Sequence, residues 1–301
     1  MPQDARGAAI ALGNFDGVHV GHQAVIASAH EAAALSGANV GAAVFEPHPR
    51  RFFKPDTPPF RLQTPAQRAR ALAEVGVVEV FELEFDAAMA QTSDRDFAER
   101  ILRDVLDVSH VSVGENFRFG KGRSGDVASL AAYGEALGFT VTAVSSVEEN
   151  GRTISSGAIR EAIAAGDLTA ATAMLTRAWA IEGEVVHGFQ RGAGFGFPTA
   201  NVVLGDYVRP RLGVYAVRVD VGDGLLLPGV ASVGVNPTVG TLPEPLLEAH
   251  LLDFTGDLYG KTIEVEMIAF LRDEAKFDSV EALKAQMTQD VIDARRALVE
   301  R

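Results

Sequence analysis

The chain has 301 residues, which suits two domains of ordinary size, each able to bury a core of its own. Its formal net charge of -13 argues against a general nucleic-acid-binding surface, where a basic footprint is expected. A nucleotide site stays open, because such a site needs only local hydrogen-bond donors. The lack of cysteine excludes disulfides, thiolate metal sites and thiol nucleophiles.

Neither secretion nor membrane insertion is indicated. The segment Met1–Gly17 lacks the basic stretch and the long apolar core of a signal peptide. No apolar run approaches the roughly 20 residues of a membrane-spanning helix. We therefore expect a cytoplasmic protein whose partners are small molecules, with neither nucleic acid nor a membrane among them. The sequence leaves self-association undetermined.

The first half of the chain alternates short apolar runs with longer helical patterns. Strands are expected at Ala8–Leu12, Val40–Phe45, Val77–Phe81, His110–Val113 and Thr140–Val144. Helices are expected at His22–Leu35, Pro65–Glu74, Asp94–Leu106 and Val127–Leu137, followed by Ala158–Ala165 and Leu168–Leu175. This alternation predicts a Rossmann-like α/β domain with a parallel sheet and right-handed crossovers. Ligands of such sheets sit outside the carboxyl ends of the strands.

The sequence pattern changes in the second half of the chain, where short segments rich in branched residues are separated by clusters of turn-forming residues. Strands are expected at Ala180–Val186, Gly213–Val221, Leu225–Val233, Leu247–Leu252 and Thr262–Ile268. A helix is expected near Val280–Leu298. The pattern predicts an antiparallel barrel or sandwich. We place the domain boundary so that the domains span residues 1–176 and 177–301.

The segment Gly13–His22 follows the first expected strand and opens the first expected helix. Its small residues let the backbone approach a phosphate, and the helix N-terminus offers free N–H groups and positive potential. His19 and His22 are three residues apart and face the same way on a helical turn. Two imidazoles there can stabilise the oxygens of a polyphosphate that gain charge. The alternatives are a histidine metal site, for which no third ligand is evident nearby, and surface or capping residues.

This segment resembles the signature of the nucleotidyltransferase superfamily. The run from Gly13 to His19 resembles specifically the bacterial bifunctional riboflavin kinase/FAD synthetase family. The resemblance implies an HxGH-type domain that adenylylates FMN with ATP, with His19 and His22 as catalytic residues. It implies ATP or phosphate contacts at Gly13, Phe15, Asp16, Gly17 and Gly21.

Two loops of the first half add further candidates. Pro47 and Pro49 stiffen the loop that holds His48, which either borders a substrate cleft or forms a structural turn. The loop 114–123 is basic and aromatic, and it follows a strand. It is not a P-loop, because the glycine spacing is one residue too long and Gly122 stands where serine or threonine is required. It suits a planar anionic ligand, and the resemblance places flavin contacts at Asn116, Phe117 and Arg118; a solvated basic loop is the alternative.

A serine pair precedes the helix expected at Ala158–Ala165. Ser155 or Ser156 can cap that helix. In the family the corresponding run grips the outer ATP phosphates, which implies this role for Ser155 and Ser156 and a catalytic role for Arg160. Gly157 replaces the family's threonine and removes one hydroxyl donor.

The segment Gly188–Asn201 is dense in glycine and ends in Pro-Thr-Ala-Asn. Such a turn can wrap a phosphate chain with backbone N–H groups, and Thr199 and Asn201 offer neutral oxygens to Mg²⁺. A flexible hairpin is the alternative from composition alone. The segment resembles the flavokinase motif, which implies metal binding by Thr199 and Asn201. It also implies ATP contacts at Gly192, Gly194, Gly196 and Pro198.

Glu248 lies on an expected strand, on the same face as His250. A carboxylate that accepts the hydroxyl proton aids phosphoryl transfer to a primary alcohol. An exposed strand face is the alternative reading. The run resembles one in which the family's glutamate is the catalytic base, and that role is implied for Glu248. Further matches imply flavin contacts at Tyr215, Arg272 and Phe277.

The resemblance covers nearly the whole chain. It implies an α/β nucleotidyltransferase domain and an antiparallel β-barrel flavokinase domain with a C-terminal helix. ATP is expected as co-substrate, Mg²⁺ as cofactor, and riboflavin, FMN and FAD as substrates and products. Ala193 and Asn236 stand where the family has arginine, which threatens kinase rate or affinity.

Three rival functions are an FAD synthetase with an impaired kinase domain, an inactive flavin-binding protein, and an adenylyltransferase for another substrate. Retention of Thr199, Asn201 and Glu248 argues against the first rival. His19 and His22 argue against the second, and the flavokinase-like barrel argues against the third.

Overall fold

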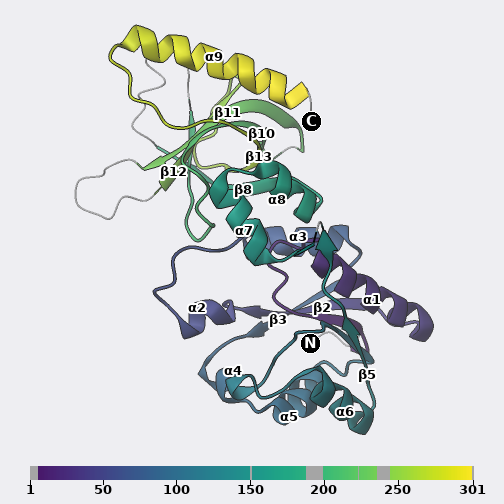
Figure 1. The fold of residues 1–301 in the computed structure, drawn as a ribbon. Helices are drawn as coiled ribbons and strands as arrows, with labels where there is room; N and C mark the ends of the chain where they lie inside the picture. Colours follow the sequence, from purple (N-terminus) through teal and green to yellow (C-terminus); the bar gives the residue numbers. More distant parts are fainter. Residues whose placement is uncertain (1–5, 150, 188–198, 223, 236–244, 300–301) are drawn as a thin grey trace. The chain divides into compact units, whose positions relative to one another are not determined.

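The computed structural model describes residues 6–149, 151–187, 199–222, 224–235 and 245–299 (Figure 1). The chain divides into two compact units. The first comprises Met1–Thr57 and Pro65–Ser155, and the second comprises Pro58–Thr64 and Ser156–Arg301.

The first unit is built on a parallel sheet of five strands in the order β3-β2-β1-β4-β5. The strands are β1 (Ala9–Leu12), β2 (Val40–Glu46), β3 (Glu79–Glu84), β4 (His110–Gly114) and β5 (Thr140–Val144). The parallel α/β architecture predicted from sequence is thus confirmed. The largest difference from the predicted strands is in β3, which begins two residues later than expected and runs on to Glu84. An edge strand with one exposed face carries alternating glutamates, which a search for apolar runs misses.

Helices and short turns connect these strands. They are α1 (Val20–Ser36), α2 (Pro49–Phe53), α3 (Pro65–Glu74), α4 (Ala87–Gln91), α5 (Asp94–Asp96), the π-helical η2 (Phe97–Val105), η3 (Lys121–Arg123) and α6 (Val127–Leu137). A small hairpin of β6 (Glu148–Glu149) and β7 (Arg152–Thr153) follows. Alternate residues of β1 enter two different cores: Ala9 and Ala11 pack with α1, whereas Ile10 and Leu12 pack with η2 and α6. The sheet is therefore covered on both faces.

The second unit contains a closed barrel with the strand order β10-β11-β12-β9-β8-β13, in which all the pairs that the structure describes are antiparallel. Its strands are β8 (Trp179–Val186), β9 (Ala200–Val203), β10 (Gly213–Asp220), β11 (Leu226–Val235), β12 (Pro245–Leu251) and β13 (Thr262–Arg272). The helix α9 (Val280–Val299) packs against β10, β11 and β13. The prediction of an antiparallel barrel with a C-terminal helix is confirmed. The helices α7 (Ser156–Ala165) and α8 (Leu168–Leu175) also belong to this unit.

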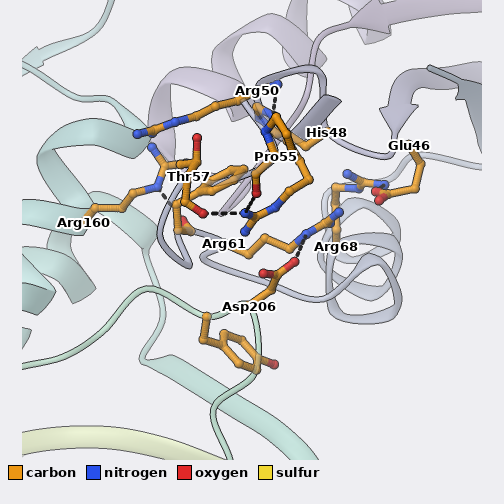
Figure 2. Close-up of polar contacts among 12 residues, drawn as sticks. Glu46, His48, Arg50, Pro55, Thr57, Arg61, Arg68, Arg160 and Asp206 are labelled. Carbon is orange, nitrogen blue, oxygen red and sulfur yellow. Dashed lines mark hydrogen bonds and ion pairs between the residues drawn. The ribbon is translucent and has the colours of Figure 1, made fainter. Parts of the chain in front are cut away.

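A short strap from the first half of the chain, Pro58–Thr64, completes the second unit. Leu62 is fully buried in the barrel core, and its carbonyl accepts a hydrogen bond of 2.9 Å from Nε1 of Trp179. Arg61 forms a parallel bridge beside Tyr207 and an ion pair of 3.9 Å with Asp206 (Figure 2). The core of this unit is therefore built from two separate stretches of sequence.

Within the described ranges, no helix combines the length and the apolar character that crossing a membrane requires.

Candidate active sites

The turn that ends β1 is held in an uncommon backbone conformation. Phe15 has φ 50° and Val18 has φ 43°, both in the left-handed region that non-glycine residues rarely adopt. Phe15 and Val18 are 1% and 0% exposed, so the surrounding core fixes these angles. Such residues cost about 1–3 kcal/mol each and persist where the surroundings over-determine them, often at functional sites. The turn is thus pre-shaped before any ligand binds.

The two histidines of this segment lie ring on ring at the start of α1. His19 is the N-cap residue, and its Nδ1 accepts a hydrogen bond of 3.4 Å from the backbone N–H of His22. The ring centroids are 3.7 Å apart and the planes are inclined by 20°. A Cβ on Gly21 would lie 3.2 Å from the His19 ring, which explains why glycine stands between them. The motif therefore gathers two imidazoles at a helix N-terminus, where anionic groups bind favourably.

A cavity of about 280 Å³ opens beside these rings. The cavity is lined by His19 and His22. Five other residues that the sequence predicted as ATP, phosphate or flavin contacts also line it: Gly13, Phe15, Gly21, Asn116 and Phe117. Asp16 does not line this cavity and is buried, and Gly17 does not line it either. The histidine pair therefore faces a space suited to part of a nucleotide, with the glycine turn along one side.

A larger cavity of about 780 Å³ adjoins the first, because Gly13, Asn116 and Phe117 line both. His48 and Arg118, two of the sequence candidates, also line it. Much of its wall is aromatic, from Phe45, Phe53, Phe85, Phe97, Phe117 and Phe119. Aromatic walls favour a planar ring system. Phe117 and Phe119 belong to the aromatic loop 114–123 that was singled out from the sequence. The other four phenylalanines were not predicted as part of this site, because they come from distant segments that only the fold brings together.

Cationic side chains lie along the same cavity. They are Arg50, Arg118, Lys121 and Arg123. Arg118 forms an exposed ion pair of 3.2 Å with Asp126. A cavity with an aromatic wall and several cations suits a planar ligand that carries negative charge.

Ser155 is the last residue of the first unit, whereas Ser156 and Arg160 belong to the second unit, on α7. Nε of Arg160 donates a hydrogen bond of 2.6 Å to the carbonyl of Phe60, and its guanidinium lies 5.4 Å from the Phe60 ring centroid. Arg160 is therefore held by the strap.

The candidate kinase residues come together on adjacent barrel strands. Asn201 on β9 lies directly opposite Glu248 on β12, whose other neighbour is Ser232 on β11. Thr199 precedes β9 by one residue, and its carbonyl accepts a hydrogen bond of 3.3 Å from Nδ2 of Asn201. Thr199 also lines a cavity of about 210 Å³ together with Phe254 and other barrel residues. The remaining glycine-loop candidates, Gly192, Gly194, Gly196 and Pro198, and the departures Ala193 and Asn236 lie outside the described residues.

The side chains of Thr199 and Asn201 carry neutral oxygens, which are suitable donors to a magnesium ion. The bond from Nδ2 of Asn201 to Thr199 leaves the amide oxygen of Asn201 turned away from that carbonyl, and Thr199 adds a hydroxyl. Within the described ranges, no group of three or more His, Asp or Glu side chains is arranged to hold a metal. Mg²⁺ suits such a sparse set of oxygens because it keeps several waters and shares the phosphates of its substrate.

The three predicted flavin contacts of the barrel domain have structural partners. Tyr215 is fully buried, and its hydroxyl donates to the carbonyl of Arg211. Arg272 makes two hydrogen bonds of 2.7 Å to the carboxylate of Asp290 on α9. The guanidinium of Arg272 lies 5.9 Å from the ring centroid of Phe277. Their contact with flavin stays a prediction.

Together, these features define the class of protein. It has an α/β domain of the nucleotidyltransferase type with stacked histidines, followed by a closed β-barrel in which Glu248 and Asn201 lie side by side. Family models agree with this division. Residues 1–158 match the FAD synthetase family and residues 175–298 match the riboflavin kinase family. The chain belongs to the bifunctional riboflavin kinase/FMN adenylyltransferase family.

Relatives and a solved structure extend the match over nearly the whole chain. The chain is 45% identical to the bifunctional riboflavin kinase/FMN adenylyltransferase of Pseudomonas fluorescens, covering 96% of this chain and 93% of that protein. It is 41% identical to the Escherichia coli (strain K12) protein of the same description, over 98% and 93% of the two chains. A crystal structure described as a macrolide-efflux protein from Streptococcus pneumoniae is 32% identical, with a TM-score of 0.87 over 96% and 94% of the two chains. Both halves thus share one ancestry with these proteins.

Proposed function

We propose that this chain phosphorylates riboflavin to FMN in its barrel domain and adenylylates FMN to FAD in its α/β domain, with one ATP consumed in each reaction. The observation that carries the proposal is the pair of adjoining cavities in the first unit. One cavity holds the stacked His19 and His22, the other is lined by aromatic side chains, and both share Gly13. Two ligands that react with each other need two such neighbouring spaces.

In the adenylyl transfer, the flavin ring of FMN occupies the aromatic cavity and its phosphate reaches the junction at Gly13. A phosphate oxygen of FMN attacks the α-phosphorus of ATP, the bond from that phosphorus to the bridging oxygen breaks, and pyrophosphate leaves. His19 and His22 donate hydrogen bonds to the oxygens that gain charge. The pre-shaped turn supports this role because its donors need little reorganisation during the reaction.

In the kinase reaction, the terminal hydroxyl of riboflavin attacks the γ-phosphorus of ATP and ADP leaves. Glu248 accepts the hydroxyl proton. Thr199 and Asn201 would hold Mg²⁺, whose charge would offset that of the phosphates. The register that sets Asn201 beside Glu248 supports this assignment. We place both reactions in the cytoplasm, where ATP is supplied.

A direct test incubates the purified chain with riboflavin, ATP and Mg²⁺ and separates the flavins by chromatography. Formation of FMN and then FAD supports both activities. FMN alone leaves only the kinase. If supplied FMN is converted to FAD but riboflavin is not phosphorylated, only the adenylyl transfer remains. No conversion of either flavin contradicts the proposal.

The phosphate-binding roles of Ser155, Ser156 and Arg160 are also part of the proposal. Replacing Arg160 by Gln removes the cationic fork, and we expect the KM for ATP in FAD formation to rise. An unchanged KM would remove Arg160 from the site.

A further inference from the structure

We propose that Arg68 is a positioning residue of the adenylyl transfer, which fixes the Asn14–Phe15 peptide between the two cavities. The inference rests on the proposed function and adds a residue that neither the sequence motifs nor the cavity linings contain. Arg68 lies on α3, outside the signature segment and outside both cavities.

Arg68 is 4% exposed and makes three contacts through its guanidinium. Nη1 lies 3.5 Å from the backbone carbonyl of Asn14, and Nη2 lies 3.3 Å from a carboxylate oxygen of Glu46 and 3.3 Å from one of Glu82. Figure 2 shows Arg68 beside Glu46. Asn14 follows β1, Glu46 is the last residue of β2, and Glu82 lies on β3. One buried side chain therefore ties together three neighbouring strands near the carboxyl edge of the sheet.

The chemistry of the side chain suits this task. A planar guanidinium offers several donors in a fixed fork, so it can hold a carbonyl and two carboxylates at once. A buried cation is tolerated only when it is paired and hydrogen-bonded, which Glu46 and Glu82 achieve. A further donor, on Nη1, is directed to the Asn14 carbonyl, one residue before the left-handed Phe15. Arg68 thus holds the entry to the strained turn.

Asn14 is the group through which Arg68 acts on the substrate. Asn14 is one of the residues that line the larger cavity. Its Oδ1 is buried and has no hydrogen-bond partner among the described residues. A buried acceptor without a partner is unfavourable, and this favours a turn of the amide toward the cavity when a ligand there offers a donor. The flavin substrate carries hydroxyl donors on the chain between its ring and its phosphate. Arg68 holds the peptide so that this amide meets such a hydroxyl.

The first experiment compares Arg68→Met with Arg70→Met, a control at an exposed arginine on the same helix. Steady-state rates of FAD formation from FMN and of FMN formation from riboflavin are measured in each full-length chain. We expect kcat for FAD formation to fall about 10- to 100-fold in Arg68→Met, with a smaller change in the KM for ATP. The kinase rate should match that of Arg70→Met. Equal kcat values for FAD formation in the two variants, or a parallel loss of both activities in Arg68→Met, would overturn the inference.

The second experiment tests the link to Asn14 and covers the case in which Arg68→Met does not fold. Arg68→Lys keeps the charge but not the fork, and we expect it to restore only part of kcat. Asn14→Ala alone should slow FAD formation. Combined with Arg68→Lys, it should cost less than the product of the two single effects, because residues that act as one unit are not additive. Fully multiplicative effects, or full activity of Arg68→Lys, would contradict the inference. If the unaltered chain makes no FAD from FMN, the proposed function itself fails, whatever the variants do.

Discussion

Asn201 and Glu248 face each other across the β9–β12 pair of the barrel, in direct register. Directly opposed residues of antiparallel strands have Cβ atoms about 4.5–5.5 Å apart and project from the same face. The two residues lie 47 positions apart in the sequence and have separate proposed roles, metal binding by Asn201 and proton acceptance by Glu248. Their register places the two residues next to each other on the barrel wall. The proposed proton acceptor therefore lies beside the proposed metal ligand.

The first prediction concerns this carboxylate. Replacing Glu248 by Gln keeps the shape of the side chain and removes its ability to accept a proton. We expect the rate of FMN formation from riboflavin to fall by about 10²–10⁴-fold. FAD formation from supplied FMN should stay within about twofold, since that site lies in the other unit. Glu184→Gln, at an exposed carboxylate of β8, is the matched control and should change neither rate. If Glu248→Gln forms FMN nearly as fast as the unaltered chain does, Glu248 is not the catalytic base.

The second prediction concerns the stacked imidazoles. His19→Ala and His22→Ala should each lower kcat for FAD formation by about 10²–10³-fold, as expected when one donor to a developing negative charge is lost. The double variant should be little slower than either single variant, because the two rings act on the same phosphate as a unit. The kinase rate in the same chains serves as the internal control. Strictly multiplicative losses would mean that the rings act independently.

The third prediction separates stability from activity at Gly21. A Cβ here would lie 3.2 Å from Cε1 and Nδ1 of the His19 ring, so the ring must move by a few tenths of an ångström. Gly21 lies in the first turn of α1, where alanine is a better helix former by up to about 1 kcal/mol. Gly21→Ala should therefore keep or raise the melting temperature while lowering kcat for FAD formation several-fold. A full rate with an unchanged KM would show that the position of the ring is not critical.

The sequence predicted best those sites whose residues are adjacent in the chain. It predicted less of the sites whose residues come together only in the folded structure. The segment Gly13–His22 could be recognised because its residues are adjacent and strand, turn and helix follow directly in the chain. Most of the aromatic wall was missed because Phe53 lies on α2, Phe85 directly follows β3 and Phe97 begins η2, and the three meet only in the folded unit. The strap Pro58–Thr64 was missed because the barrel residues that it contacts follow it by about a hundred residues in the sequence. A strand as short as β9 also gave no apolar run, so one barrel strand was not predicted.

The fourth prediction uses a buried histidine outside both sites. His110 on β4 hydrogen-bonds through Nδ1 to the Thr140 hydroxyl at 2.7 Å and through Nε2 to the Ser112 hydroxyl at 3.0 Å, and Ser112 contacts Ser28 on α1 at 3.0 Å. Burial lowers the pKa of His110 below its ordinary value of 6.5. The unfolded chain therefore binds a proton at this residue more readily than the folded chain.

Because the folded chain binds this proton less readily, a neutral His110 contributes its full stabilisation above about pH 6.5. That contribution is lost as the pH falls from 6.5 toward the lowered pKa of His110. Urea unfolding between pH 5 and pH 8 should show a decline in the free energy of unfolding below pH 6.5. The decline should be smaller in His110→Gln, which cannot take up the proton. Identical slopes in His110→Gln and the unaltered chain would contradict the argument.

The fifth prediction concerns the strap that completes the barrel unit. Leu62 is 0% exposed among Ile159, Leu175 and Trp179, although it precedes them by about a hundred residues. Leu62→Ala removes buried methyl groups and leaves a cavity, which should lower the free energy of unfolding by about 2–5 kcal/mol. Leu35→Ala is the control, since Leu35 is 92% exposed and should cost no more than about 0.5 kcal/mol.

The fluorescence of Trp179, the only tryptophan of the chain, reports the unfolding of this unit directly. If the strap is part of the barrel core, the transition of Trp179 moves to lower urea concentration in Leu62→Ala even though the substitution lies in the first quarter of the sequence. The kinase reaction should then lose activity at a lower temperature than in the unaltered chain. A Trp179 transition that does not move would mean that the barrel folds without the strap, and that its core is closed by residues 156–301 alone.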